Sequence, residues 1–277
     1  MTFPIILAHG VCRFDVVIND FLHLDNNDDP TLDRLHYFRG IRTMLKANGF
    51  HVYHSKVSWA ADVTTRAEDL RRNIEAVLNK EEADKVNIIA HSMGGLDSRH
   101  MLFNGRDSNR IHERVASLTT ISTPHEGSPF ADWMTDHLPR VIPTARQLGL
   151  DLKALSDLRT DQCKAFNDHP DVIVFEQECE KSIQFQTYAG RQRFWGVFDA
   201  LKLPYYVIEK REGENDGLVS VQSARWRDRY FKGTIDETDH LNELGWWEPA
   251  QLFAGEGESE LLERIHKLYL NIAQGLP

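Results

Sequence analysis

A run of β-branched residues that stops abruptly at a serine is the feature that most constrains this chain. Residues 86–95 read Val-Asn-Ile-Ile-Ala-His-Ser-Met-Gly-Gly, so a buried strand is expected to end at Ser92 and a helix to follow. A serine in so sharp a strand-to-helix turn has strained backbone angles, and the residues two before and two after it must be small. Ala90 and Gly94 meet this need, although alanine replaces the first glycine of the usual G-x-S-x-G pattern. The pattern predicts that Ser92 is a nucleophile.

A nucleophilic serine needs a histidine base and a carboxylate that orients the base, and after a turn of this kind the acid comes first along the chain. Asp216 lies in a tight polar turn, and His240 lies in a loop that ends a polar stretch. Asp239 is the main rival of Asp216 as the partner of His240, but adjacent residues rarely face each other. The sequence therefore predicts a catalytic triad of Ser92, Asp216 and His240.

These motifs occur together in the order that a known family shows. The chain resembles the bacterial triacylglycerol lipases of the α/β-hydrolase superfamily, and the matching blocks span nearly its whole length. The resemblance implies ester hydrolysis through an acyl-serine intermediate at Ser92, with no cofactor. The blocks are PIILAHG (4–10), IIAHSMGGLDSR (88–99), LTTISTPHEGSP (118–129), ENDGLVS (214–220) and DHLNE (239–243).

Two backbone N–H groups are expected to form an oxyanion hole for the oxygen that gains charge on the ester carbonyl. In an α/β-hydrolase one donor belongs to the residue after the nucleophile, and the other lies in the loop after an early strand. Met93 and Val11 occupy these positions, because the first apolar run stops at His9-Gly10. Loss of one such donor typically lowers the rate by about a hundred- to a thousand-fold.

Apolar runs alternate with helical periods along the chain, which is typical of a mostly parallel central sheet with helices on both faces. With 277 residues and 41% hydrophobic content, the sequence predicts a single α/β-hydrolase domain over residues 1–277. The interval of about 128–203 is too long for one connection and predicts a helical cap or lid insertion. Strands are expected at 4–8, 51–54, 86–90, 115–121, 183–189 and 205–209, and a closing helix at about 259–273.

An apolar stripe begins the predicted insertion. Phe130, Trp133, Met134 and Leu138 recur at helical spacing. Either this stripe packs on the core, or it is the inner face of a mobile lid that covers Ser92 in water and contacts lipid when it opens. On the second interpretation these four residues are candidates for the substrate pocket or lid, and the protein makes transient contact with a lipid surface.

The resemblance also raises the question of calcium. Many of these lipases hold the histidine loop with an ion bound partly by an aspartate two residues after the catalytic histidine, where this chain has Asn242. The partner aspartate would fall near Gly196. A hard cation loses its preferred charged oxygens when both carboxylates are missing, so we expect no structural calcium and no other metal. A disulfide across the acid loop, which many relatives carry, is excluded because no cysteine lies near Asp216.

Charge, cysteines and the first residues bear on partners and compartment. A net charge of −10 argues against nucleic acid, and no apolar run approaches membrane-spanning length. Three scattered cysteines suit reduced thiols. Met1 lies almost directly against the first expected strand, which leaves no room for an export signal. The sequence as written predicts a cytoplasmic enzyme, and a secreted protein shortened at its amino terminus would look the same.

Several functions remain open within this chemistry. The first is a triacylglycerol lipase, and a short-chain carboxylesterase or polyester hydrolase would use the same residues. An acyltransferase would pass the acyl group to a bound alcohol instead of water. A non-catalytic protein on this scaffold is disfavoured because all three triad candidates are present. In each enzyme the substrate is a lipid or a small-molecule ester.

Overall fold

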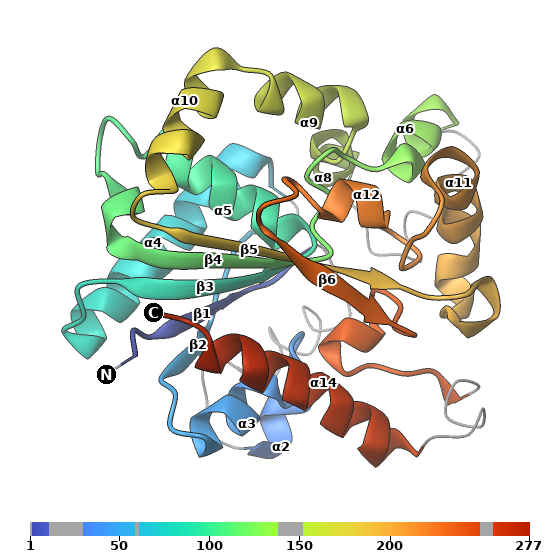
Figure 1. Cartoon of the computed structure of the whole chain (residues 1–277), viewed down its shortest axis with the longest axis horizontal. Helices are drawn as coiled ribbons and strands as arrows, with labels where there is room; N and C mark the ends of the chain where they lie inside the picture. Colours follow the sequence, from blue (N-terminus) through green and yellow to red (C-terminus); the bar gives the residue numbers. More distant parts are fainter. Residues whose placement is uncertain (1, 11–29, 59–60, 138–151, 250–256) are drawn as a thin grey trace.

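The computed structural model describes residues 2–10, 30–58, 61–137, 152–249 and 257–277 (Figure 1). In this part of the chain six parallel strands form one sheet in the order β2-β1-β3-β4-β5-β6. This confirms the predicted α/β class with a parallel central sheet and helices on both faces. The strands are β1 (Ile5–Ala8), β2 (Val52–His54), β3 (Val86–His91), β4 (Val115–Ile121), β5 (Gln184–Arg191) and β6 (Phe231–Asp236).

Helices cover both faces of the sheet, with α4 and α5 on one face and α3 and α14 on the other (Figure 1). None of the helices in the described ranges combines the length and apolarity that a bilayer crossing requires. The helices are α2 (Pro30–Asp33), α3 (Ile41–Ala47), α4 (Val63–Glu81), α5 (Met93–Asn104), α6 (Pro129–Asp136), α8 (Leu152–Asp157), α9 (Thr160–Asn167), α10 (Pro170–Cys179), α11 (Lys202–Glu212), α12 (Val221–Ala224) and α14 (Glu258–Gln274), with 3₁₀ helices η1 (Ile111–Arg114), η2 (Phe194–Gly196), η3 (Asp199–Leu201) and η4 (Asn242–Leu244).

The central strands alternate between two hydrophobic cores. Ile6 and Ile88 pack toward α4 and α5, whereas Ile5 and Ile89 pack toward α3 and α14. All of these side chains are buried. Because both faces of a parallel sheet are covered, its strands read as continuous apolar runs instead of alternating ones, and this is why β1, β3 and β4 are visible in the sequence.

Two elements differ from the sequence prediction. The expected strand at 205–209 is wrong, because these residues lie in α11, where Tyr205 and Ile208 are buried three residues apart against α6. The aromatic and β-branched residues at 205–208 favour a strand locally, but their packing against the rest of the fold stabilises a helix instead. The sixth strand is instead β6, which is an edge strand of mixed polarity with no fully buried residue. The expected closing helix is confirmed as α14.

Candidate active site

Ser92 lies between the end of β3 and the first residue of α5. Its backbone has φ 55° and ψ −132°, a conformation that a residue with a side chain rarely adopts. A Cβ atom at Gly94 would lie 2.5 Å from the carbonyl oxygen of Ala8 and 2.7 Å from that of His9. The end of β1 therefore passes so close to the start of α5 that only glycine fits at position 94.

Of the two predicted oxyanion donors, the structure describes Met93 but not Val11. Met93 is the first residue of α5, and the first N–H groups of a helix have no partner within the helix and carry partial positive charge. The Met93 N–H is thus available beside Ser92. Val11 lies outside the described residues, so its part in an oxyanion hole stays a prediction.

Asp216 and His240 are in direct contact. Asp216 Oδ2 lies 2.7 Å from His240 Nδ1, and both residues are buried. The second carboxylate oxygen of Asp216 accepts hydrogen bonds from the backbone N–H groups of Leu218 and Val219, at 2.8 and 2.7 Å. The backbone N–H of His240 also donates to the backbone carbonyl of Asp216 at 2.9 Å. The carboxylate is therefore fixed by two backbone N–H groups and holds the imidazole by one nitrogen.

Asp239, the rival acid, is occupied elsewhere. Its Oδ1 accepts from the N–H groups of Leu241 and Asn242, both at 2.9 Å, and its Oδ2 accepts from the Phe198 N–H at 2.8 Å. These bonds shape the turn that enters η4. Among the described residues it is Asp216 and not Asp239 that contacts the imidazole of His240.

The His240 ring lies beside the residue that precedes Ser92. The ring centroids of His91 and His240 are 4.4 Å apart. Within the described ranges, no hydrogen bond joins the Ser92 hydroxyl to His240. Catalytic hydrogen bonds are often long in unliganded enzymes and tighten in the substrate complex, so this geometry is compatible with a serine–histidine pair.

A second, buried polar network lies behind the Asp216–His240 pair. His91 Nε2 lies 2.9 Å from Glu243 Oε2, and His91 Nδ1 lies 2.8 Å from the Tyr37 hydroxyl. Ser122 Oγ donates to Glu243 Oε1 at 2.7 Å and accepts from the Gly190 N–H at 2.9 Å. The network connects the ends of β3, β4 and β5 to η4, and so joins the strand that carries Ser92 to the loop that carries His240.

The buried position of Glu243 near Asp216 changes the pKa of its carboxyl group. Burial raises its pKa well above the usual range for glutamate, and the nearby charge of Asp216 raises the pKa further. Burial also lowers the pKa of His91 well below its usual value. A neutral Glu243 can donate to a neutral His91 while it accepts from Ser122. The sequence analysis missed Tyr37, His91, Ser122 and Glu243 as members of the site. The available signal was that His91, Ser122 and Glu243 lie within the motif blocks already identified.

The positions that hold calcium in similar lipases do not fit that ion here. Asn242 Oδ1 accepts from the Asp239 N–H at 3.0 Å, and its amide nitrogen donates to the Trp246 carbonyl at 2.9 Å. Gly196 has no side-chain oxygen, and a Cβ atom there would lie 2.5 Å from the Gln192 side chain. No pair of carboxylates is available at these positions, and we derive no step through a metal.

The predicted pocket or lid stripe lies on α6. Phe130 and Met134 are buried in a cluster that includes Leu201 and residues of α11, and Trp133 is partly buried with its ring centroid 5.9 Å from that of Phe130. Leu138 lies outside the described residues. The stripe therefore packs against α11 in this structure, and its movement as a lid stays a prediction.

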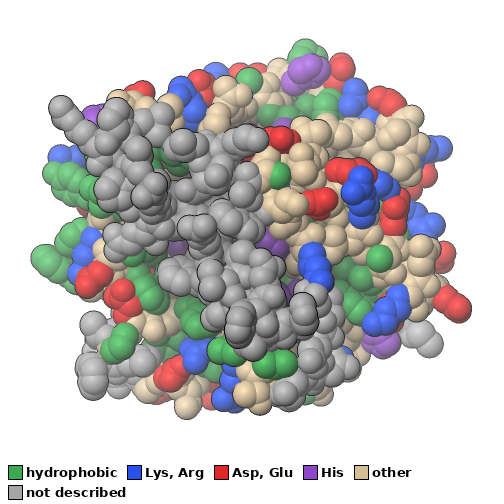
Figure 2. All heavy atoms as spheres, turned by 180° about the vertical axis from the view of Figure 1, so that it is seen from behind, with side chains coloured by type: hydrophobic (Ala, Val, Ile, Leu, Met, Phe, Trp, Pro, Cys, Tyr) green, Lys and Arg blue, Asp and Glu red, His purple; other side chains and the backbone are tan. Residues whose placement is uncertain are grey.

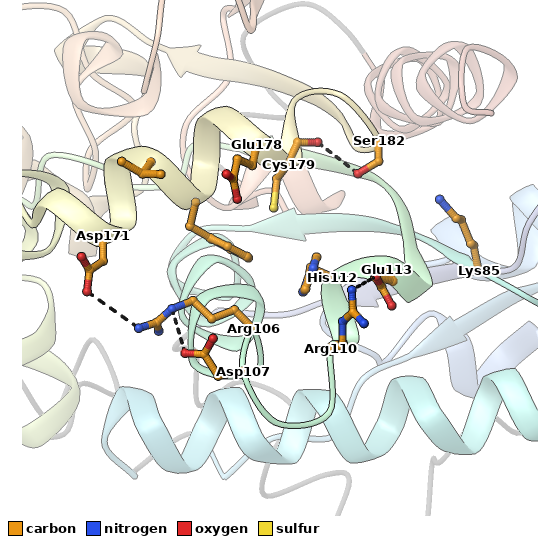
Figure 3. A pocket seen from close by; sticks show the side chains of 12 residues that line it. Lys85, Arg106, Asp107, Arg110, His112, Glu113, Asp171, Glu178, Cys179 and Ser182 are labelled. Carbon is orange, nitrogen blue, oxygen red and sulfur yellow. Dashed lines mark hydrogen bonds and ion pairs between the residues drawn. The ribbon is translucent and has the colours of Figure 1, made fainter.

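A cavity of about 610 Å³ lies away from these residues, between η1, α10 and the end of α5 (Figure 3). Arg106 forms ion pairs with Asp107 at 3.2 Å and Asp171 at 3.9 Å, and Arg110 pairs with Glu113. Residue 85, which also lines it, precedes β3, so the cavity lies at the amino ends of the strands, opposite Ser92. Cys179 and Ser182 also line this cavity, which does not include Asp216 or His240.

Comparisons with known proteins agree with this fold. Residues 60–157 match the family described as PGAP1-like alpha/beta domain. The mature lipase of Bacillus licheniformis has 22% sequence identity and a TM-score of 0.63 over 87% of this chain and 85% of that one. A metagenomic carboxyl esterase has 17% identity and a TM-score of 0.67 over 98% of this chain and 76% of that one. At these identities the structures show the shared fold.

Two curated relatives align along most of the chain. Triacylglycerol lipase 2 of Saccharomyces cerevisiae is 29% identical over 88% of this chain and 80% of its own length. A triacylglycerol lipase of Vibrio cholerae is 32% identical over 86% of this chain and 80% of its own length. The chain therefore belongs to the triacylglycerol lipase family of the α/β-hydrolase superfamily and is a carboxylic-ester hydrolase.

Proposed function

We propose that the protein hydrolyses the ester bonds of acylglycerols with Ser92 as nucleophile, His240 as general base and Asp216 as the residue that orients the base. The observation that carries this proposal is the 2.7 Å contact between Asp216 Oδ2 and His240 Nδ1 beside the strained turn at Ser92. The substrate class rests on the relatives named triacylglycerol lipase.

The proposed reaction has two half-steps. His240 Nε2 takes the proton from Ser92 Oγ as the oxygen attacks the ester carbonyl, and the Met93 N–H stabilises the negative oxygen that forms. Collapse of this intermediate breaks the ester bond, and His240 gives its proton to the departing alcohol. Water, deprotonated by His240, then releases the fatty acid from Ser92. Throughout, Asp216 holds the proton-bearing Nδ1 and stabilises the imidazolium.

Contact with lipid through a lid is a separate part of the proposal. Phe130, Trp133 and Met134 of α6 pack toward α11, and a movement of α6 away from α11 would present this stripe to a lipid surface. The test is a rate profile across acyl-chain lengths, below and above the solubility limit of each ester. A rate that rises smoothly through that limit would contradict the lid.

The central test replaces the nucleophile. Ser92→Ala should lose at least about a thousand-fold in kcat toward a soluble chromogenic ester, because the remaining groups cannot form the acyl-enzyme. The exposed Ser108→Ala is the matched control and should keep wild-type activity. A fluorophosphonate should label the wild type at residue 92 and leave the variant unlabelled. Wild-type activity in a folded Ser92→Ala protein would refute the assignment.

The same assay separates hydrolysis from acyl transfer. With a soluble alcohol present in water, a hydrolase releases mainly the free acid, whereas an acyltransferase forms mainly the exchanged ester. We expect free acid as the main product, in keeping with relatives named as lipases and esterases.

A further inference from the structure

The end of β5 is bonded to both loops of the candidate triad. We call residues 214–220, which include the proposed acid, the acid turn, and residues 236–240, which include the proposed base, the histidine turn. The Gln192 N–H donates to a backbone carbonyl of the acid turn at 3.0 Å, and the Arg191 carbonyl accepts from a backbone N–H of the histidine turn at 3.2 Å. The backbone at the end of β5 therefore holds both turns.

The Arg191 side chain bridges the same two turns. Its Nη1 lies 2.8 Å from Glu214 Oε1 in the acid turn, and its Nε lies 2.7 Å from Asp236 Oδ1, where β6 ends and the histidine turn begins. Its Nη2 lies 3.3 Å from Asp236 Oδ2. The hydrogen bond from Arg191 lowers the pKa of Asp236 below its ordinary value. Because a guanidinium presents five donors in a planar fork, one side chain can hold a carboxylate from each turn.

Ion pairs are common on this protein, so pairing alone does not distinguish Arg191. On the face shown in Figure 2, acidic and basic side chains lie close together at several places. Several arginine pairs join near neighbours in the sequence, as Arg110 does with Glu113. The two partners of Arg191 lie 23 and 45 residues further along the chain. They come two residues before Asp216 and four residues before His240, so this pair of contacts crosses between the two loops that carry the proposed acid and base.

The bridge is open to solvent. The Arg191 side chain is 40% exposed, and those of Glu214 and Asp236 are 64% and 57% exposed. All three residues line a cavity of about 900 Å³. Exposed ion pairs contribute little to folding and are screened by salt. We therefore expect the bridge to adjust the geometry of two turns that the backbone already holds, without deciding whether the protein folds.

We propose that Arg191 is a positioning residue of the triad, which joins the acid turn to the histidine turn and so keeps Asp216 in contact with His240. In the described ranges its side chain bonds to no triad residue, and it acts through the contact between Asp216 Oδ2 and His240 Nδ1. A looser contact stabilises the imidazolium of the transition state less well, so kcat falls while KM does not change. This inference rests on the proposed function for the reaction, whereas the bridge itself does not.

The first test measures kcat and KM on a soluble chromogenic ester, with circular dichroism as the control for folding. Arg191→Gln should lower kcat by about three- to tenfold and leave KM within about twofold, because each exposed pair is worth up to about a fivefold change. Arg191→Lys should recover part of the loss, since an ammonium keeps the charge but not the planar fork. The matched control is Arg110→Gln, which breaks an exposed arginine pair beside the cavity at the amino ends of the strands and should match wild type.

Two further measurements separate loss of the bridge from loss of a charge. NaCl at about 1 M reduces the screening length to about 3 Å, so it should lower the kcat of wild type more than that of Arg191→Gln. The effect of Arg191→Gln should not add to that of the double variant Glu214→Gln, Asp236→Asn, because these changes break the same bridge.

Proton NMR reports on the bridged contact without turnover. The strongly downfield resonance of the proton between His240 Nδ1 and Asp216 Oδ2 should move upfield in Arg191→Gln and stay in place in Arg110→Gln. The same comparison in a Ser92→Ala background tests the bridge even if residue 92 is not the nucleophile, so failure of this inference and failure of the proposed function are distinguishable. Wild-type kcat in Arg191→Gln, an unchanged resonance, or additive effects in the combined variant would each overturn the proposal.

Discussion

His91 Nε2 and Glu243 Oε2 lie 2.9 Å apart, and both side chains are fully buried. His91 immediately precedes the candidate nucleophile, and Glu243 follows the candidate base by three residues. A bond between these two residues therefore sets how the end of β3 and the histidine loop lie relative to each other. Because neither side chain meets water, loss of one leaves the facing atom of the other, His91 Nε2 or Glu243 Oε2, without this hydrogen bond.

Two replacements of Glu243 should show how much its hydrogen bonds, as distinct from its charge, contribute to the free energy of unfolding. Glu243→Leu leaves His91 Nε2 and the Ser122 hydroxyl proton buried without a partner, at about 1–3 kcal/mol for each group, so we expect the free energy of unfolding to fall by about 2–6 kcal/mol. Glu243→Gln keeps an acceptor for Ser122 and a donor for His91, and at about pH 5, where the wild-type carboxyl is favoured in its neutral form, it should stay within about 1 kcal/mol of wild type. Urea unfolding measures both. Equal stabilities of the two variants would contradict the network.

The pH dependence of the same pair has a defined sign. The folded-state pKa of Glu243 is raised above its ordinary value of 4.5 by burial and by Asp216. A neutral carboxyl is favoured in the folded state, so its contribution is complete below pH 4.5 and is lost as the pH rises toward the folded-state pKa.

Glutamine cannot ionise. The stability of Glu243→Gln relative to wild type should therefore increase between pH 5 and 7, with a slope of up to about 1.4 kcal/mol per pH unit. Urea unfolding of both proteins at each pH gives this difference directly. A difference independent of pH would show that Glu243 is ionised in the folded protein.

The two neighbouring acids should respond differently to amidation. Asp216→Asn disturbs the tautomer of His240 and should lower kcat toward a soluble ester by about 10⁴-fold. Asp239→Asn keeps an oxygen for the N–H groups of Leu241 and Asn242, and we expect it to lose less than about tenfold, since it removes no contact to the imidazole. Circular dichroism controls for folding. The opposite order of effects would make Asp239 the orienting acid.

The turn at Ser92 should not tolerate a single added methyl group at position 94. A Cβ atom there would meet the carbonyl oxygens of Ala8 and His9, which are backbone atoms and cannot rotate away. We expect Gly94→Ala to cost about 1–3 kcal/mol in stability through this overpacking and to lower kcat at least about tenfold by displacing Ser92.

Gly257→Ala is the matched control, because a Cβ atom at Gly257 would meet nothing within 4 Å. Thermal unfolding and kcat on a soluble ester are measured for both variants. Equal behaviour of the two would show that β1 and α5 are less closely packed than this structure indicates.

The sequence predicts those parts of the site that depend on residues close to one another in the chain. The turn at Ser92 depends on residues within four positions of it, and the buried strands β1, β3 and β4 are apolar because both of their faces are covered. The contact of Asp216 with His240 was predicted by the order of motifs, although chain order does not determine a distance.

Features that depend on distant packing were harder to predict. The residues at 205–209 have strand-forming side chains, but burial of Tyr205 and Ile208 against α6 makes them helical. β6 lies at the sheet edge and carries lysine, glycine and aspartate, so no apolar run marks it. Glu243 is charged and follows a polar loop, as a solvated residue would, and only the fold reveals that it is buried in η4 against His91 at the end of β3.

The order of β1 in the sheet and the positions of Asp216 and His240 have a consequence for biosynthesis. The first strand lies between β2 and β3, so it cannot gain both neighbours until residue 91 has been made. The proposed acid and base follow more than a hundred residues after Ser92. On the proposed mechanism, a ribosome-bound chain can thus complete half of the sheet and display its serine while it still lacks the acid and base, and it stays inert until residues 216 and 240 have been translated and folded.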